Sequence, residues 1–266
     1  MREKIIAITG GTIVLPDRAI QGSILVQNGR IKAITPAEQT DQIQADYQVI
    51  DAQGMYVVPG MIDIHSDAIE KEIEPRPGSY FPMDMAFYEL ERKLVGHGIT
   101  TMYHGLSLSG GVGVRSDEIV EQALQEFYRL SQMRSLIRHR LHLRYEVINF
   151  PAVDMVRKHI SDGSIHLFSF MDHSPGQGQY SAPGSYTTYV SKTHGLQNEE
   201  ARAMARLMVE KHAQVDWQKL KELAVSARAA GIPLASHDDD SKEKVDQNLL
   251  RSLSIGHARL CISSDQ

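Results

Sequence analysis

The hydrophobic pattern of the chain changes character at about residue 58. Before this point the apolar residues fall in short runs, and after it short apolar runs alternate with longer amphipathic segments. Short apolar runs bounded by turn residues are typical of strands, whereas apolar residues spaced three and four apart are typical of helices that face a core. The pattern therefore predicts an all-β part over residues 1–57 and a larger part in which strands and helices alternate.

The all-β part contains several short runs with strand character. The predicted strands are Ile5–Ile8, Thr12–Leu15, Ser23–Val26, Arg30–Ile34 and Gln48–Ile50. Asn28-Gly29 separates two of these runs, and both residue types tolerate the positive φ angles of a two-residue hairpin turn. The sequence therefore predicts a β-hairpin at this position.

The larger part reads as a repeating strand–helix unit. The predicted strands are Gly60–His65, Thr100–His104, His142–Ile148, Ile165–Met171 and Ile232–Ser236. The predicted helices are Met85–Val95, Asp117–Ile137, Ala152–Ile160, Glu199–Ala213 and Trp217–Ala230. Ser116 is a good N-cap for the second helix, and acidic residues follow it in the first turn. Such alternation predicts an α/β fold with a parallel sheet.

Polar residues of one chemical kind follow several of these strands. The candidates are Asp63, His65 and Asp67 on the first strand, Glu146 on the third, Asp172 and His173 after the fourth, and His237 and Asp238 after the fifth. The carboxyl ends of parallel strands in an α/β barrel share one face, which holds the active site. Imidazoles and carboxylates are ligands of divalent metals. The sequence therefore predicts one metal site built from distant segments.

Each candidate also has a simpler interpretation. Glu146 alone could be a surface strand end, Arg76 could be an exposed residue of a rigid Pro-rich loop, and Asp239 and Asp240 fit the start of a helix. The Gly110–Gly113 segment lacks the ending of a P-loop, although its backbone N–H groups could face an anion. The remaining histidines are expected to be structural or exposed: His97, His104, His139, His142, His166, His194, His212 and His257.

Composition narrows the class of protein. The 266 residues are 42% hydrophobic and 23% charged, which is ordinary for a soluble globular protein with one large and one small domain. The net charge of −5, without a basic patch that contains aromatic residues, argues against a nucleic-acid partner. Cys261 is the one cysteine, so no internal disulfide can form. Without a signal-peptide core or a membrane segment, we expect a cytoplasmic protein with no membrane partner.

The β-rich start that runs into the segment Pro59–His65 resembles the amidohydrolase superfamily of metal-dependent hydrolases. This resemblance implies a TIM-like (β/α) barrel with a small β-sandwich, to which residues 1–57 would contribute. It also implies one or two divalent ions, with Zn²⁺ or Mn²⁺ expected. Asp67 stands where the superfamily usually has a second histidine.

With Asp67 at this position, the sequence resembles one branch of the superfamily, the PhnM-type family of phosphonate metabolism in the C–P lyase pathway. The matching segments are Asp63–Lys71, Pro75–Gly78, Gly98–Thr101, His142–Glu146, Met171–Gln177 and Ala235–Asp239. The resemblance covers roughly residues 1–245. It implies hydrolysis of α-D-ribose 1-methylphosphonate 5-triphosphate, a phosphorylated ribose phosphonate, to the 5-phosphate and diphosphate.

The resemblance also assigns roles to residues. As metal ligands it implies His65, Asp67, Glu146, His173 and His237, with Glu146 in the bridging position. As catalytic residues it implies Glu146, His237 and Asp238. Lys71, Arg76 and Arg144 are the candidate phosphate contacts, because arginine and lysine are the usual partners of phosphate.

The resemblance ends at about Val245, and residues 246–266 are expected to be an aberrant tail. Five predicted strands are fewer than the eight of a closed barrel, so we expect residues 58–245 to form an incomplete barrel. Truncation, with loss of the family activity, is the favoured explanation; completion by another chain, as in a homo-oligomer, is the other. Alternative functions are a cyclic amidohydrolase or deacetylase acting on a C–N bond, and a non-catalytic remnant subunit.

Overall fold

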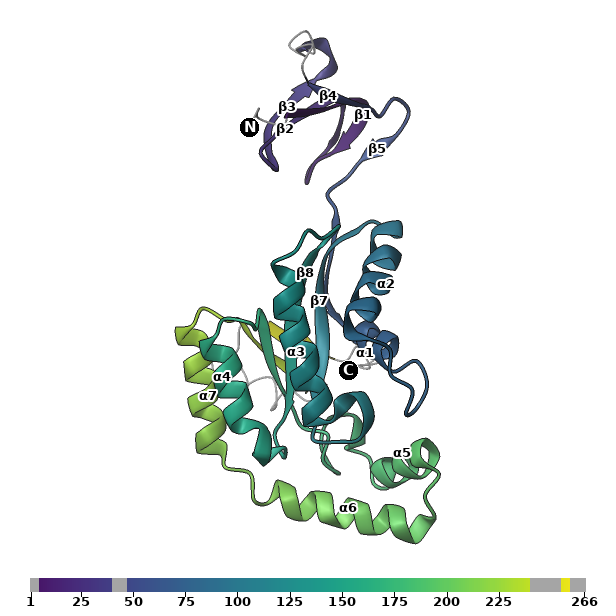
Figure 1. Ribbon diagram of the computed structural model, residues 1–266, viewed down its shortest axis with the longest axis vertical. Helices are drawn as coiled ribbons and strands as arrows, with labels where there is room; N and C mark the ends of the chain where they lie inside the picture. The colour runs from purple at the N-terminus through teal and green to yellow at the C-terminus, as the bar shows by residue number, and fades with distance from the viewer. Residues whose placement is uncertain (1–4, 40–46, 240–254, 259–266) are drawn as a thin grey trace. The chain divides into compact units, whose positions relative to one another are not determined.

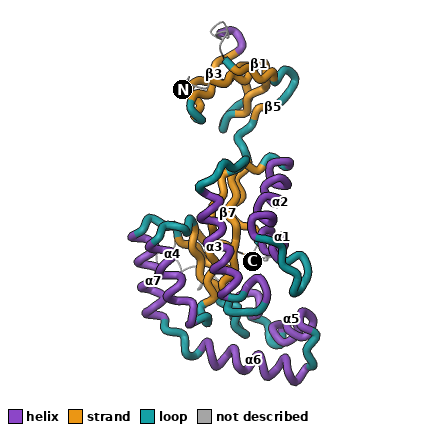
Figure 2. The backbone as a smooth tube through the Cα atoms, viewed as in Figure 1, coloured by secondary structure: helices purple, strands orange, loops and turns teal. Residues whose placement is uncertain are grey.

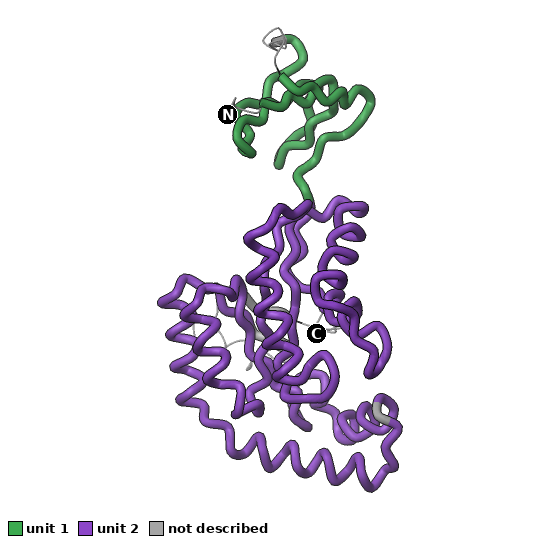
Figure 3. The backbone as a smooth tube through the Cα atoms, viewed as in Figure 1, with its two compact units in different colours: residues 1–60 green, residues 61–266 purple. Residues whose placement is uncertain are grey.

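The computed structural model describes residues 5–39, 47–239 and 255–258. The chain divides into two compact units, Met1–Gly60 and Met61–Gln266 (Figure 3). Each unit is described by itself.

The first unit is a five-stranded mixed sheet. Its strands are β1 (Ile5–Val14), β2 (Ala19–Gln27), β3 (Arg30–Pro36), β4 (Gln48–Asp51) and β5 (Tyr56–Val57), and a short 3-10 turn, η1 (Ala37–Gln39), follows β3. The strand order is β3-β2-β1-β4, and β5 also pairs with β1. The predicted hairpin is confirmed, because β2 and β3 pair antiparallel and Asn28 and Gly29 have φ angles of 51° and 75°.

The two predicted strands Ile5–Ile8 and Thr12–Leu15 are one strand in the structure. Strand β1 passes through a register shift between Ile8 and Gly11, where Gly10 has a φ of 70°. A Cβ on Gly11 would lie 2.7 Å from a methyl group of Val57, so only glycine fits there without a shift of its neighbours. The glycines that suggested a break between strands therefore form a β-bulge within one strand.

The second unit contains a six-stranded sheet in which all strand pairs are parallel, as predicted. Its strands are β6 (Met61–Ser66), β7 (Ile99–Leu108), β8 (Arg138–Glu146), β9 (Leu167–Met171), β10 (Leu234–Asp239) and β11 (Ile255–Ala258). Spatial order follows chain order from β6 to β11. Ile255–Ala258, within the segment expected to be an aberrant tail, pairs with β10 as a sixth strand.

Helices and short 3-10 turns connect the strands (Figures 1 and 2). The helices are α1 (Ala68–Ile73), α2 (Met83–Gly96), α3 (Asp117–Ser131), α4 (Val153–Ser161), α5 (Ser185–His194), α6 (Asn198–His212) and α7 (Trp217–Ala229). The turns are η2 (Gly113–Arg115), η3 (Phe150–Ala152) and η4 (Gly178–Tyr180). The sequence pattern did not predict α1 or α5. None of the described helices has the length and hydropathy that a membrane span requires.

Helix α3 begins where predicted and ends earlier than predicted. The hydroxyl of its N-cap, Ser116, accepts the backbone N–H of Ile119 at 3.4 Å. The helix stops at Ser131 instead of Ile137. The Glu91 carboxylate on α2 accepts the backbone N–H of Leu136 at 2.6 Å, which holds this segment as a connection into β8. A tertiary contact thus outweighs the helical pattern of the sequence.

The hydrophobic core lies between one face of the sheet and helices α2, α3, α4 and α7. Strand β8 shows why the sheet has two different faces. Its residues Leu141, Leu143 and Tyr145 are fully buried in this core. Successive side chains of a strand point to opposite faces, so the residues between them point away from the helices. A sheet whose strands follow chain order, with helices on one face, has the topology of an opened α/β barrel.

Candidate functional site

The candidate site is built on the face of β8 that the helices do not cover. His142, Arg144 and Glu146 occupy alternate positions on this face, and their exposed fractions are 4%, 5% and 3%. They lie in register with Leu167, Ser169 and Met171 of β9. Three buried polar side chains in one row need partners, since an unpaired buried polar group is costly.

Glu146 contacts His173, which follows the neighbouring strand β9. The two oxygens of the Glu146 carboxylate accept the Nδ1–H of His173 at 2.7 Å and its backbone N–H at 2.9 Å. Because a carboxylate only accepts, Nδ1 carries the proton and the neutral ring has its lone pair on Nε2. Carboxylates fix the tautomer of metal-ligating histidines in this way. Glu146 and His173, which lie 27 positions apart in the chain and were predicted to share one site, are therefore in direct contact.

His65 contacts a histidine that sequence reasoning had set aside. Its Nδ1 lies 3.3 Å from Nδ1 of His142, and Nε2 of His142 lies 2.9 Å from the Ser169 hydroxyl. His142 stands two residues before Arg144 and four before Glu146, so the strand period of two would have placed all three side chains on the same face of the sheet. The Asp63 carboxylate accepts the backbone N–H of His65 at 3.0 Å.

Asp67 is surrounded by arginines. One of its carboxylate oxygens contacts Arg144, and the other lies 3.6 Å from Arg115. Arg115 also pairs with Glu70 at 2.8 Å, and Glu70 accepts the backbone N–H of Ser107. Sequence reasoning missed Arg115, because it considered only the backbone of the glycine-rich segment before it. The predicted phosphate contact Arg144 therefore binds a predicted metal ligand.

The electrostatics of this network are balanced. Burial raises the pKa of Glu70, and the neighbouring Arg115 opposes that rise. Burial would lower the pKa of Arg115, but the carboxylates of Glu70 and Asp67 hold it above its usual value. The ion pairs join the two carboxylates of Asp67 and Glu70 to the two guanidiniums of Arg115 and Arg144. Opposite charges at these distances stabilise one another most where solvent access is low.

Glu74 connects the two loops that flank this network. Its carboxylate accepts the backbone N–H groups of Gly78 and Val114, each at 2.7 Å. The Gly78 N–H lowers the pKa of Glu74. A Cβ on Gly113 would lie 2.5 Å from the carboxylate, so this close approach needs glycine. The carboxylate thus fixes the loop that carries Arg115.

The other two predicted phosphate contacts lie in exposed positions. Arg76 is exposed in the loop after α1, where it forms an isolated β-bridge with Ser79. Lys71 is exposed on α1. The contacts of the described residues bring neither side chain to Asp67 or Glu146. Both roles remain predictions.

Asp172 makes a second carboxylate–imidazole pair beside His173. One of its oxygens lies 2.9 Å from Nε2 of His212 on α6, and the other accepts the backbone N–H of Ser174 at 3.2 Å. The side chain therefore ties the end of β9 to α6. Sequence reasoning had considered His212 structural or exposed.

The fit of a divalent metal can be tested on these contacts. Imidazole and carboxylate donors of the right chemistry are present in His65, Glu146 and His173. Asp67 fits less well, because both its oxygens face guanidinium groups. Within the part of the chain that the structure describes, no three histidine, cysteine or acidic residues form a group that could hold a metal ion. The side chains of His237 and Asp238 lie outside the described residues, although their backbone forms β10.

Comparison with known proteins identifies a relative that acts on a phosphonate. No family model matches the chain. The chain is 29% identical over 231 residues to the α-D-ribose 1-methylphosphonate 5-triphosphate diphosphatase of Escherichia coli (strain K12). The chain resembles this diphosphatase. The match covers 85% of the chain and 59% of the relative, so the chain spans less than two thirds of the relative's length. A dihydroorotase of Syntrophus aciditrophicus (strain SB) is 32% identical over 71 residues, which are 26% of the chain and 16% of that protein.

Solved structures establish the fold. A D-hydantoinase matches with a TM-score of 0.51 at 17% identity, over 96% of this chain and 57% of its own. An adenosine deaminase from Xanthomonas campestris with bound zinc matches with a TM-score of 0.54 at 11% identity, over 95% of this chain and 62% of its own. The fold is therefore the α/β barrel of these chains, here incomplete, which confirms the predicted fold class.

Proposed function

We propose that the protein is a metal-dependent hydrolase of phosphonate catabolism. Its substrate would be α-D-ribose 1-methylphosphonate 5-triphosphate, cleaved to the 5-phosphate and diphosphate. The observation that carries this proposal is the 29% identity over 231 residues to the diphosphatase. Because the chain spans only 59% of that relative, the proposal concerns the activity of the relative's complete site.

The arginines of the site support a phosphorylated substrate. Arg115 and Arg144 converge on Asp67 from two different elements, so two guanidiniums lie beside one carboxylate. Guanidinium groups bind phosphate oxygens through two parallel hydrogen bonds. A triphosphate would take one or both of them as partners, in competition with Asp67. Without these cations, the carboxylates of the site would repel the substrate.

The metal proposal rests on the imidazole and carboxylate donors at the carboxyl ends of the strands. We assign His65, Glu146, His173 and His237 as ligands, and Asp67 as a fifth if a bound ion displaces its arginine partners. A divalent ion supplies a bound water whose pKa is lowered towards about 7. Glu146 holds His173 in the tautomer that presents Nε2. The resemblance implies that Glu146, His237 or Asp238 takes the proton of the water.

The proposed reaction balances as a single hydrolysis. The water oxygen forms a bond to the phosphorus nearest the ribose, and the bond from that phosphorus to the bridging oxygen breaks. Diphosphate leaves with the electron pair, and the water proton passes to a side chain of the site. Arg115 and Arg144 would offset the negative charge that develops on the phosphate oxygens.

The direct test measures diphosphate release by the purified protein with Zn²⁺ or Mn²⁺. We expect release from the ribose triphosphate, with loss of at least about a hundredfold in Glu146→Gln and in His173→Ala. Arg157→Ala is a matched control, because Arg157 forms an exposed pair with Asp154 and should leave the rate unchanged. A folded protein that releases no diphosphate with either metal would contradict the proposal.

The same preparation separates the alternative functions. The hydantoinase neighbours share only the fold, so cleavage of a C–N bond in a hydantoin or dihydroorotate is the competing hydrolase activity. We expect no cleavage of either compound. A non-catalytic subunit would need no metal, so stoichiometric zinc or manganese in the purified protein supports the hydrolase and its absence supports the remnant.

A further inference from the structure

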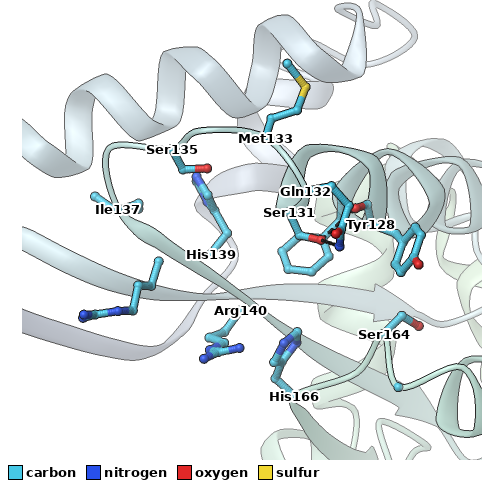
Figure 4. Close-up of a pocket in the computed structure, with 13 residues that line it drawn as sticks. Tyr128, Ser131, Gln132, Met133, Ser135, Ile137, His139, Arg140, Ser164 and His166 are labelled. Atoms are coloured by element: carbon cyan, nitrogen blue, oxygen red, sulfur yellow. Dashed lines mark hydrogen bonds between the residues drawn. The ribbon is translucent and has the colours of Figure 1, made fainter. Parts of the chain in front are cut away.

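A pocket of about 500 Å³ lies at the amino ends of β8 and β9 (Figure 4). The end of α3, the connection into β8 and the turn before β9 form its walls. Arg138 at its rim stands eight residues before Glu146 on the same strand, which corresponds to about 26 Å of extended chain. The pocket therefore lies at the opposite end of β8 from the Glu146–His173 pair.

The charged groups of this pocket are cations. Arg138 and Arg140 line it, and no aspartate or glutamate is among its described lining residues. The segment 134–140 carries three arginines and no acidic residue, in a chain of net charge −5. Local positive charge in an acidic protein favours an anionic ligand.

The two arginines differ from those of the candidate site in their partners. Arg115 and Arg144 form ion pairs with carboxylates. Among the ion pairs of the described residues, none involves Arg138 or Arg140. The guanidinium donors at this end of the sheet are thus not neutralised by a described carboxylate, and each can offer a fork of N–H groups to an oxyanion.

His166 lies beside Arg140, as Figure 4 shows, and its ring also forms a hydrogen bond with the backbone of Ser164. Nδ1 of His166 accepts the backbone N–H of Leu141 at 3.2 Å, so Nε2 carries the proton of the neutral ring. Burial and the nearby Arg140 lower the pKa of His166, which keeps the ring neutral at pH 7. The hydroxyls of Ser131 and Ser135 also line the pocket.

The wall of the pocket is held from behind by Glu91. The Glu91 carboxylate accepts the backbone N–H of Leu136 at 2.6 Å and contacts Nε2 of His139 at 3.1 Å. Glu91 is 5% exposed, and its charge is satisfied by these donors. The arginines therefore start from an anchored segment, and less conformational freedom would be lost when a ligand binds.

We propose that this pocket binds the phosphate group of a phosphorylated small molecule between Arg138 and Arg140. Its volume exceeds that of a phosphate and lies within the range of small-molecule sites. Tyr128 and Met133 give it an apolar wall, against which the organic part of the ligand packs. The cleavage reaction proposed above does not require this pocket.

The test uses calorimetric titration of the full chain at low salt with ribose 5-phosphate, inorganic phosphate and ribose. We expect ribose 5-phosphate to bind more tightly than phosphate, and ribose not to bind. The double variant Arg138→Ala/Arg140→Ala should weaken ribose 5-phosphate binding by at least about tenfold. Arg134→Ala, in the same segment but outside the lining, should change it by less than about twofold.

Location is checked by hydrogen exchange of the peptides that cover residues 131–140, where the ligand should slow exchange. Unchanged affinity in the double variant would overturn the proposal, as would equal weakening by Arg134→Ala, which indicates general surface attraction. Absence of binding by both phosphates at millimolar concentration would overturn it as well. His173→Ala should bind ribose 5-phosphate normally, and a loss there would place the anion in the candidate site instead.

Discussion

The two faces of strand β8 show opposite ways of using polar side chains. On the helix side, His139 joins Glu91 and the buried His104 in a chain of hydrogen bonds of 3.1 and 2.8 Å. His104 is fully buried, its Nε2 pairs with His139, and its Nδ1 has no hydrogen-bond partner among the described residues, so this cluster serves the fold. On the other side, His142, Arg144 and Glu146 form a row of charged and imidazole side chains that alternates with the core residues of the strand. The polar cluster on the helix side is enclosed in the core, whereas the other face carries the side chains of the candidate site.

The largest expected effect on the free energy of unfolding comes from a substitution on the helix side of β8. Leu143 is fully buried in the core, and Leu143→Ala should lower the free energy of unfolding by about 3 kcal/mol, because the cavity left behind cannot collapse fully. Arg140→Ala, on the other face, should lower it by less than about 0.5 kcal/mol. Urea unfolding followed by the fluorescence of Trp217, the one tryptophan of the chain, measures both. Equal losses would show that the two faces do not differ in their contribution to stability.

The sequence predicted the faces better than the connections. Alternating residues such as Leu143 and Tyr145 identify a buried strand because the strand period is two. The end of α3 and the residues 132–137 after it were not predictable, since the Glu91 carboxylate that holds Leu136 lies 45 positions away in the chain.

The candidate site was predicted in its chemistry and only partly in its contacts. The carboxylate of Glu146 and the imidazole of His173, each near the end of a strand, indicated a shared site, and the two side chains are in contact in the structure. The partners of Asp67 were not predictable, because Arg115 reaches it from a loop whose glycines suggested backbone binding alone. Helix α5 was missed since Thr187, Thr188 and Val190 are weak helix formers that tertiary contacts hold in place.

The next effect concerns the acid sensitivity of the helix-side cluster. Burial and the neighbouring His139 lower the pKa of His104 to about 3, from an ordinary value of 6.5. The unfolded chain therefore binds a proton that the folded chain excludes, so stability is fully present above pH 6.5 and is lost as the pH falls towards 3. Between pH 6.5 and 5 this group alone should remove about 2 kcal/mol.

His104→Asn tests this assignment by comparing the loss of unfolding free energy between pH 7 and pH 5. The variant should lose about 2 kcal/mol less than the parent over this interval. His97→Asn is the matched control, because His97 is exposed at the end of α2 and its removal should leave the pH dependence unchanged. Identical pH profiles for the parent and His104→Asn would show that the buried imidazole does not control acid stability.

The third prediction concerns His142, on the uncovered face, where the expected loss of stability is smaller than at Leu143 or His104. His142→Gln can keep a hydrogen bond to the Ser169 hydroxyl, because the glutamine amide reaches the position of Nε2, so it should cost about 1 kcal/mol of unfolding free energy. It removes the ring that contacts His65, and loss of such a supporting contact typically weakens metal binding by about tenfold or more. Chelator competition for Zn²⁺ measures this change. Ser169→Ala, which leaves the His65 contact in place, should weaken Zn²⁺ binding less. An unchanged Zn²⁺ affinity in His142→Gln would mean that the uncovered face, like the helix side, uses its histidines for the fold.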